Sequence, residues 1–244
     1  MKKPRIEWTG ATSIKCKPNP AKLVVELSPN AEAALGKISP GFRLLGLTLG
    51  RFSFGDLIRA ILRQTGPADV VVSTWTAGIR DLETMAYLLE RGQLERVRFM
   101  VGDGFATCQP AVARRLVELF GLESVILAHT HAKFAMIRRD DWRIVIRTSM
   151  NLSRNPRIEQ FEIDDDAEIF EFYEGVCKSI ASVTPAGMAS VWGNIAKALK
   201  LSLTGGLIDF DDLELDPAVD VDAMLAELAD EPIDVDALIA EAIW

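Results

Sequence analysis

The chain has 244 residues, of which 49% are hydrophobic and 25% are charged. This length and composition allow a substantial buried core, which excludes a disordered or fibrous protein. No apolar run reaches the roughly 18 to 20 residues of a membrane helix, and no secretory stretch follows the N-terminus, so we expect a cytoplasmic protein without a membrane partner. The three cysteines, Cys16, Cys108 and Cys177, are widely separated, which argues against both a disulfide framework and a zinc site.

The net charge of −8 conceals an asymmetry along the chain. Residues 205–244 hold 13 Asp or Glu and no Lys or Arg, whereas the other 204 residues have a net charge of +5. The first 20 residues contain five basic side chains and one acidic side chain, Glu7. The distribution predicts a body that binds a polyanion and an acidic tail that interacts with another surface. A solubilising arm is the alternative interpretation of residues 1–20.

We expect three parts: a basic arm over residues 1–20, a folded domain over 21–204, and an acidic tail over 205–244. The tail contains near copies, fourteen residues apart, that begin at Asp220 and Asp234. Each opens with acidic residues and continues with an apolar stripe, so each can form a short helix that is stable only against a surface. That surface is a partner protein or the chain's own basic body. A purely solubilising tail is the alternative.

Hydrophobic periodicity predicts that strands and helices alternate in the first half of the domain. A strand over Lys22–Leu27 and a helical stretch after Asn30 come first. The further expected helices are Phe54–Gln64, Asp81–Arg91 and Ala111–Phe120, and the further expected strands are Asp69–Thr76, Arg96–Val101 and Ser124–His129. This alternation predicts an α/β fold in which helices cover both faces of a sheet.

From residue 131 the expected strands follow one another directly. The segments His131–Ile137 and Arg143–Leu152 flank a polar turn and predict a hairpin, and a third strand is expected over Ile158–Ile163. The triplet Asp164-Asp165-Asp166 then predicts the start of a helix that runs to about Ser182. A metal site built from the three carboxylates is the alternative. A last helix is expected over Met188–Leu201.

Four polar side chains are expected to meet on the hairpin. Because side chains alternate along a strand, His131 and Lys133 share one face, and so do Ser149 and Asn151. If the hairpin closes symmetrically about Asp141, His131 stands opposite Asn151 and Lys133 opposite Ser149. The hairpin would then gather an imidazole, an ammonium, a hydroxyl and an amide in one patch.

The segments HAKFAMI and IRTSMNLS, followed by Glu159, resemble the signature of the phospholipase D superfamily, over about residues 55–180. The resemblance implies a mixed sheet flanked by helices, and chemistry that needs neither a metal nor a cofactor. It makes His131 the nucleophile that forms a phosphohistidine, and Lys133, Ser149 and Asn151 the donors to the phosphoryl oxygens. Glu159 would hold the His131 ring in one tautomer.

Two residues depart from the family's pattern. Arg138 stands where the family has an Asp, and Thr148 stands where it usually has Gly. The family also takes a second histidine, as the acid, from a second copy of the motif, and this chain has a single copy. We therefore expect a homodimer that brings two His131 rings together. His129 as the acid in a monomer is the alternative.

The sequence thus predicts a metal-independent phosphodiesterase that acts on nucleic acid, DNA or RNA, because Lys and Arg contacts to phosphate dominate nucleic-acid affinity. A lipid substrate is less favoured, since no membrane-seeking helix is evident. The alternatives are a catalytically degenerate protein that binds nucleic acid or builds an assembly, which the Arg138 and Thr148 departures motivate, and a regulatory protein that acts through its acidic tail.

Overall fold

The computed structural model describes residues 22–23, 28–48, 50–102, 104–128 and 130–181. The predicted basic arm, the helix Met188–Leu201 and the acidic tail lie outside these residues, as does most of the strand expected over Lys22–Leu27. These four expectations stay predictions.

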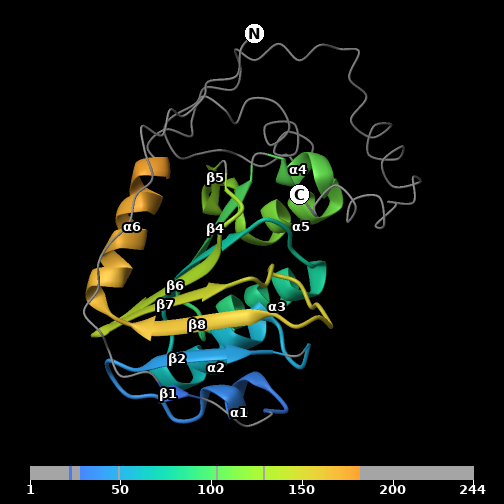
Figure 1. Cartoon of the computed structure of the whole chain (residues 1–244). Coiled ribbons are helices and arrows are strands. Elements are labelled where there is room, and N and C mark those ends of the chain that lie inside the picture. The colour runs from blue at the N-terminus through green and yellow to red at the C-terminus, as the bar shows by residue number, and fades with distance from the viewer. Residues whose placement is uncertain (1–21, 24–27, 49, 103, 129, 182–244) are drawn as a thin grey trace, which may run out of the picture. The chain divides into compact units, whose positions relative to one another are not determined.

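One mixed sheet organises the described part of the chain (Figure 1). Its strands, in spatial order, are β1 (Lys22–Leu23), β2 (Arg43–Leu47), β8 (Gln160–Asp165), β7 (Trp142–Thr148), β6 (Lys133–Arg139), β3 (Asp69–Thr74), β4 (Arg96–Gly102) and β5 (Val125–Ala128). Strands β3, β4 and β5 are parallel, whereas β6, β7 and β8 pair antiparallel with their neighbours. The predicted change from alternating elements to consecutive strands after β5 is therefore confirmed.

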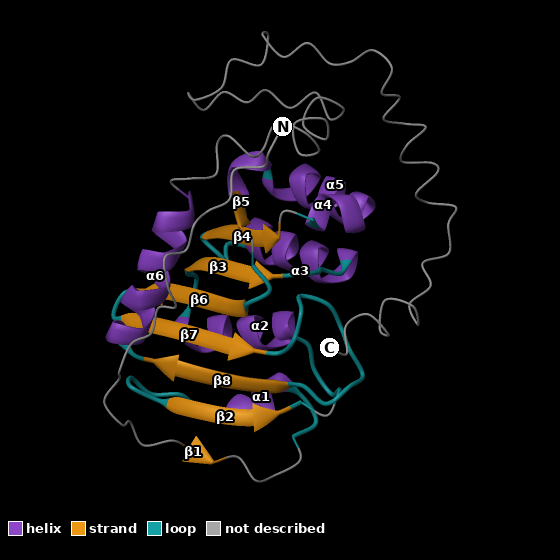
Figure 2. Cartoon of the chain, turned by 45° about the horizontal axis from the view of Figure 1, so that its top comes forward, coloured by secondary structure: helices purple, strands orange, loops and turns teal. Residues whose placement is uncertain are grey.

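Helices cover both faces of this sheet, as expected of an α/β fold. They are α1 (Ala31–Leu35), α2 (Phe54–Thr65), α3 (Ile79–Glu90), α4 (Phe105–Cys108), α5 (Pro110–Phe120) and α6 (Ala167–Ala181), with a 3-10 turn at Leu122–Ser124. In Figure 2, α1 and α2 lie behind the strands and α6 lies in front. Helix α6 packs Ile169 and Phe170 onto Phe134, Met136 and other buried side chains of the sheet. None of these helices is long and apolar enough to cross a membrane.

Local sequence explains why α2 begins where it does. Ser53 and Asp56 form a reciprocal capping box, in which each side chain accepts a hydrogen bond from the other residue's backbone N–H. The helix ends at Gly66, whose φ of 86° suits glycine. The predicted helix Phe54–Gln64 is confirmed, and its N-terminus lies directly after the loop that follows β2.

Strand β2 is an element that periodicity missed, as is the short helix α4. The sequence of β2, RLLGL, does not alternate between apolar and polar residues, so no period of two marks it. It is a strand because it pairs with β8, where Gly46 stands opposite Phe161. A Cβ atom at residue 46 would lie 2.5 Å from the Phe161 ring, so glycine makes room for that ring. The strand depends on a partner that is more than 100 residues away in sequence.

The prediction that all three aspartates start a helix is right for Asp166 only. Asp166 caps α6 by accepting hydrogen bonds from two backbone N–H groups of the first turn. Asp164 and Asp165 instead end β8 and are buried. Asp164 forms ion pairs with Arg43, at 3.0 Å, and with Arg147, while Asp165 accepts two backbone hydrogen bonds at 2.8 Å. Among the described residues, no three His, Cys, Asp or Glu side chains gather as metal ligands would.

The hairpin register differs by one residue from the symmetric closure about Asp141. Lys133 pairs with Thr148 rather than with Ser149, because β6 and β7 are joined by the two-residue turn Asp140-Asp141. Asp140 has a φ of 45°, a conformation that aspartate tolerates and that tight hairpin turns require. Strand β7 therefore ends at Thr148, and Ser149 and Asn151 lie in the loop beyond it.

Candidate active site

His131 and Lys133 meet at the start of β6. Lys133 Nζ lies 3.0 Å from His131 Nδ1 and 3.3 Å from its Nε2, so the two side chains share a face as predicted. The backbone between them is anchored, because the buried Ser73 hydroxyl of β3 donates a 2.7 Å hydrogen bond to the carbonyl of Ala132. The His131 ring is exposed, while Lys133 is partly buried.

The surroundings favour the neutral imidazole at His131. Burial lowers the pKa of His131 below its ordinary 6.5, and the charge of Lys133 lowers it further. Burial also lowers the pKa of Lys133, which the carboxylate of Glu159 partly offsets. At neutral pH His131 is therefore largely unprotonated, which is the form that can act as a nucleophile.

Ser149 and Glu159 form a second pair beside the first. The chain bends at Ser149, whose hydroxyl donates to one carboxylate oxygen of Glu159, and Asn155 donates to the other at 2.9 Å. The hydrogen bond expected between Glu159 and His131 is not among those that the described residues make. Glu159 instead acts on the histidine's neighbour, Lys133, through its charge. Asn155 was not predicted, since its role depends on the shape of the loop.

Asn151 faces the loop after β3 rather than the His131 strand. Its side-chain oxygen accepts a 3.4 Å hydrogen bond from the backbone of Thr76. The next residue, Leu152, is held on both sides, by Thr74 Oγ1 at 2.9 Å and by the N–H of Gly78 at 2.8 Å. The loop that carries Ser149 and Asn151 is thus fastened to the end of β3, on the same edge of the sheet as His131.

The segments at this edge form one connected surface, which we call the site loops: residues 50–53, residues 75–80, which include the first two residues of α3, and residues 149–159. Thr48, just before the first segment, connects it to the third. Its N–H donates to the carbonyl of Glu159 at 2.8 Å, and its carbonyl accepts from the N–H of Arg51 at 3.0 Å. Gly50, with a φ of 70°, packs so closely on Pro156 that a Cβ atom would lie 2.5 Å from its carbonyl oxygen. In Figure 2 the loop from β7 to β8 lies beyond the arrowhead of β7.

Trp75 is a neighbour of His131 that sequence reasoning did not place. It directly follows β3, and its ring centroid lies 5.0 Å from that of His131, with 52° between the planes. The side chain is 44% exposed. The pairing of β3 with β6 brings the two rings together, and periodicity alone does not reveal a contact across neighbouring strands.

The two departures from the expected motif have structural roles. Thr148 Oγ1 donates to the carbonyl of Gln160 at 2.6 Å and accepts from the N–H of Met150 at 3.0 Å, which fixes the bend before Ser149. Arg138 lies at the far end of β6 from His131 and forms ion pairs with Glu174, at 2.9 Å, and Asp69, at 3.5 Å. His129, the alternative acid, lies outside the described residues.

These contacts predict that Arg138→Asp lowers the free energy of unfolding by about 1 kcal/mol, although it restores the family's residue. The variant loses exposed ion pairs, each of which contributes roughly 0 to 1 kcal/mol, and places a carboxylate beside those of Asp69 and Glu174. Urea unfolding of the variant measures the loss. Arg138→Gln, which removes the charge without reversing it, should lie between the two proteins, and equal stability of all three would contradict the interpretation.

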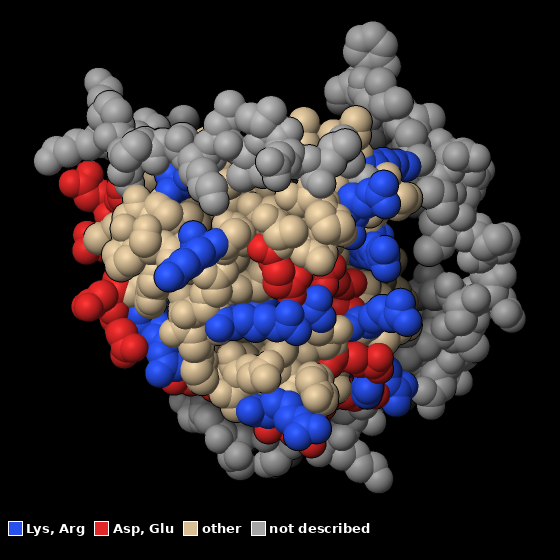
Figure 3. Space-filling view, turned by 90° about the horizontal axis from the view of Figure 1, so that it is seen from below, with Lys and Arg blue, Asp and Glu red and all other residues tan. Residues whose placement is uncertain are grey.

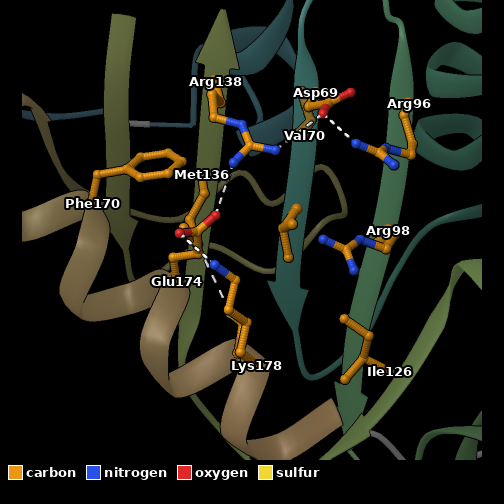
Figure 4. Close-up of a pocket in the computed structure, with 12 residues that line it drawn as sticks. Asp69, Val70, Arg96, Arg98, Ile126, Met136, Arg138, Phe170, Glu174 and Lys178 are labelled. Atoms are coloured by element: carbon orange, nitrogen blue, oxygen red, sulfur yellow. Dashed lines mark hydrogen bonds and ion pairs between the residues drawn. The ribbon is translucent and has the colours of Figure 1, made fainter. Parts of the chain in front are cut away.

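A hollow of about 80 Å³ lies near Arg138, between β3, β4, β6 and α6 (Figure 4). Its walls combine apolar side chains with charged ones, and most of the charges are paired, as in Arg96 with Asp69 and Lys178 with Glu174. None of the predicted site residues lines it. The hollow is therefore distinct from the His131 site.

No protein-family model matches the sequence, and no curated protein matches it. Among solved structures, the chain is similar to Nuc, a phospholipase D family member from Salmonella typhimurium, with 11% identity and a TM-score of 0.40 over 57% of this chain and 92% of that one. It is also similar to NucT from Helicobacter pylori, with 16% identity and a TM-score of 0.43 over 57% and 95% of the two chains.

A third similar structure is phosphatidylserine synthase from Haemophilus influenzae, with 21% identity and a TM-score of 0.39 over 55% of this chain and 36% of that one. The family of Nuc is the one that the sequence motif predicts. The structure of this chain is a mixed, helix-flanked sheet that presents the predicted motif residues His131 and Lys133 at one edge.

Proposed function

We propose that the protein is a metal-independent phosphodiesterase that cleaves nucleic acid through a phosphohistidine intermediate. The observation that carries this proposal is the exposed, largely neutral imidazole of His131, 3.0 Å from the ammonium of Lys133. A nucleophile beside a fixed positive charge is what an attack on an anionic diester requires.

In the first step a His131 nitrogen attacks phosphorus, a P–N bond forms, and the P–O bond to one nucleoside breaks. A general acid protonates the leaving oxygen. Water then attacks the phosphohistidine, loses a proton to that same group, and releases a phosphomonoester and free His131. Lys133 stabilises the negative charge that develops on the non-bridging oxygens, and Asn151 and Ser149 are the further donors. Glu159 holds the Ser149 hydroxyl in place.

A second His131, from another copy of the chain, is the proposed general acid. The exposed position of the ring is compatible with a two-fold axis that passes beside it, and an isologous interface brings equal residues together. The active species in this proposal is a homodimer with a shared site.

Nucleic acid is the proposed substrate because the site loops carry exposed arginines. Arg51, Arg80, Arg154 and Arg157 are all exposed, and none forms an ion pair with another described residue. Guanidinium groups without carboxylate partners are suited to phosphate oxygens. On the face seen from below, Figure 3 shows basic and acidic side chains intermixed.

The test is incubation of the full chain with end-labelled single- and double-stranded DNA and RNA in excess EDTA, over a range of protein concentrations. We expect cleavage to persist in EDTA and the specific activity to fall on dilution below the dimer dissociation constant. A requirement for Mg²⁺, or cleavage of none of these polymers, would refute the proposed function. A monomer that cleaves at full rate would refute the shared site.

A further inference from the structure

Trp75 holds an exposed aromatic ring at a fixed place beside His131. The turn after β3 is fixed by Thr74, whose hydroxyl donates to the carbonyl of Thr76 at 2.6 Å and accepts from the N–H of Leu152. On its other side the ring approaches β4 at Gly102, where an added Cβ atom would lie 3.7 Å from it. With 44% of its surface accessible, the ring stands at the edge of the site rather than in the core.

Other apolar side chains are exposed along the same edge. Of the five large hydrophobic side chains that are exposed among the described residues, Trp75, Ile79 and Ile158 belong to the site loops and Leu47 ends β2 next to them. Ile158 is 67% exposed and Leu47 is 62% exposed. Exposed apolar side chains that lie among charged ones along a single edge are suited to contact with a bound molecule.

The combination of this surface with the arginines indicates the chemistry of what binds. Arg51, Arg80, Arg154 and Arg157 lie on the same loops as Trp75, so anionic groups and flat apolar groups would be bound side by side. Single-stranded nucleic acid offers both, because its phosphates alternate with unpaired bases whose faces are free to stack. In a duplex the base faces are covered by neighbouring base pairs.

We propose that Trp75 stacks on an unpaired base next to the phosphate that His131 attacks, so that the site prefers single-stranded substrates. The proposal rests on the proposed function for its substrate class. In this proposal Trp75 distinguishes single-stranded from double-stranded nucleic acid, and the four arginines bind the phosphate backbone of the nucleic acid. A lipid surface is the competing occupant, since acyl chains would contact Leu47 and Ile158 without needing an aromatic ring.

Binding in a cleavage-deficient background tests this inference separately from catalysis. In the His131→Asn protein, the affinity for a fluorescent dodecamer of deoxythymidine is compared with and without Trp75→Ala by anisotropy at fixed salt. We expect Trp75→Ala to weaken binding about 5- to 150-fold, the range for losing one stacked base. Trp75→Phe should retain most of the affinity. Tyr87→Ala is the matched control, because Tyr87 is 52% exposed on α3 and pairs with Arg91 away from the site.

An oligomer of equal length and charge that lacks all bases should bind equally to the proteins with and without Trp75→Ala, as should a blunt duplex. An equal loss on normal and abasic strands, or no loss on either, would overturn the inference. A loss confined to anionic phosphatidylglycerol vesicles would overturn it in favour of a lipid surface. Cleavage by the otherwise unaltered chain reports on the proposed function independently of these outcomes.

Discussion

His131→Asn is expected to reduce the rate of phosphodiester cleavage by about 10⁴- to 10⁶-fold, the scale of losing an enzyme's nucleophile. Asparagine keeps a planar polar group beside Lys133 but cannot form the covalent intermediate. Because the His131 side chain is exposed, its loss creates no cavity, and the melting temperature should hardly change. Single-turnover cleavage of labelled DNA in EDTA measures the effect.

Quenching with detergent at alkaline pH during turnover, which preserves a P–N bond, supplies the control for this experiment. Wild-type protein should retain an acid-labile phosphorus label on one of its two histidines, and the variant should retain none. Full activity of His131→Asn would show that another group attacks phosphorus. A label that persists in the variant would point to His129.

Lys133→Met is expected to slow cleavage about 100- to 1,000-fold, as the loss of one preorganised donor to a developing oxyanion does. Methionine keeps the length and the apolar contacts of the stem but removes the charge. The variant should also raise the pKa of His131, because the ammonium is the second cause of its depression. Burial, the larger cause, remains, so the pKa of His131 should stay below 6.5.

Proton NMR can follow this shift, because the chain has only two histidines and His131→Asn identifies one resonance. In the wild type, His131, the proposed nucleophile, should become protonated and lose its ability to attack phosphorus as the pH falls through a value below 6.5. In Lys133→Met that loss should begin at a higher pH. An unchanged titration together with a large rate loss would mean that Lys133 contacts only the substrate.

Sequence patterns predicted the elements whose signal is local. The one-sided apolar stripe of α2 and the β-branched run of β3 each reflect burial of a single face or segment. The pattern failed where a distant partner decides the conformation. Strand β2 exists through its pairing with β8, and Asp164 belongs to a strand because Arg43 and Arg147 lie on the strands that flank it.

The candidate site was likewise predicted only where its contacts are local in sequence. The alternation of side chains sufficed to bring His131 and Lys133 together. It did not give the partners of Glu159, which depend on how residues 149–159 fold, or the contact of Trp75 with His131, which depends on the order of strands. The predicted register of the hairpin was also wrong by one residue. The alternating pattern of side chains does not distinguish a two-residue loop from a three-residue loop.

The alternation along β6 also links the direction of the Lys133 side chain to the packing of the core. Phe134 and Met136 face α6 and are almost fully buried, so Lys133 must face the other way. A slip of one residue that misdirected the lysine would move both side chains to the opposite face, where the smaller Ala135 and the fully buried Ile137 now pack, and would disrupt the close packing on both sides of the strand. An extra residue in the turn at Asp140 should therefore be absorbed as a longer loop and never reach Lys133. The hydrophobic core thus fixes the direction of the Lys133 side chain. The turn at the other end of β6 can therefore vary in length without moving Lys133 away from His131.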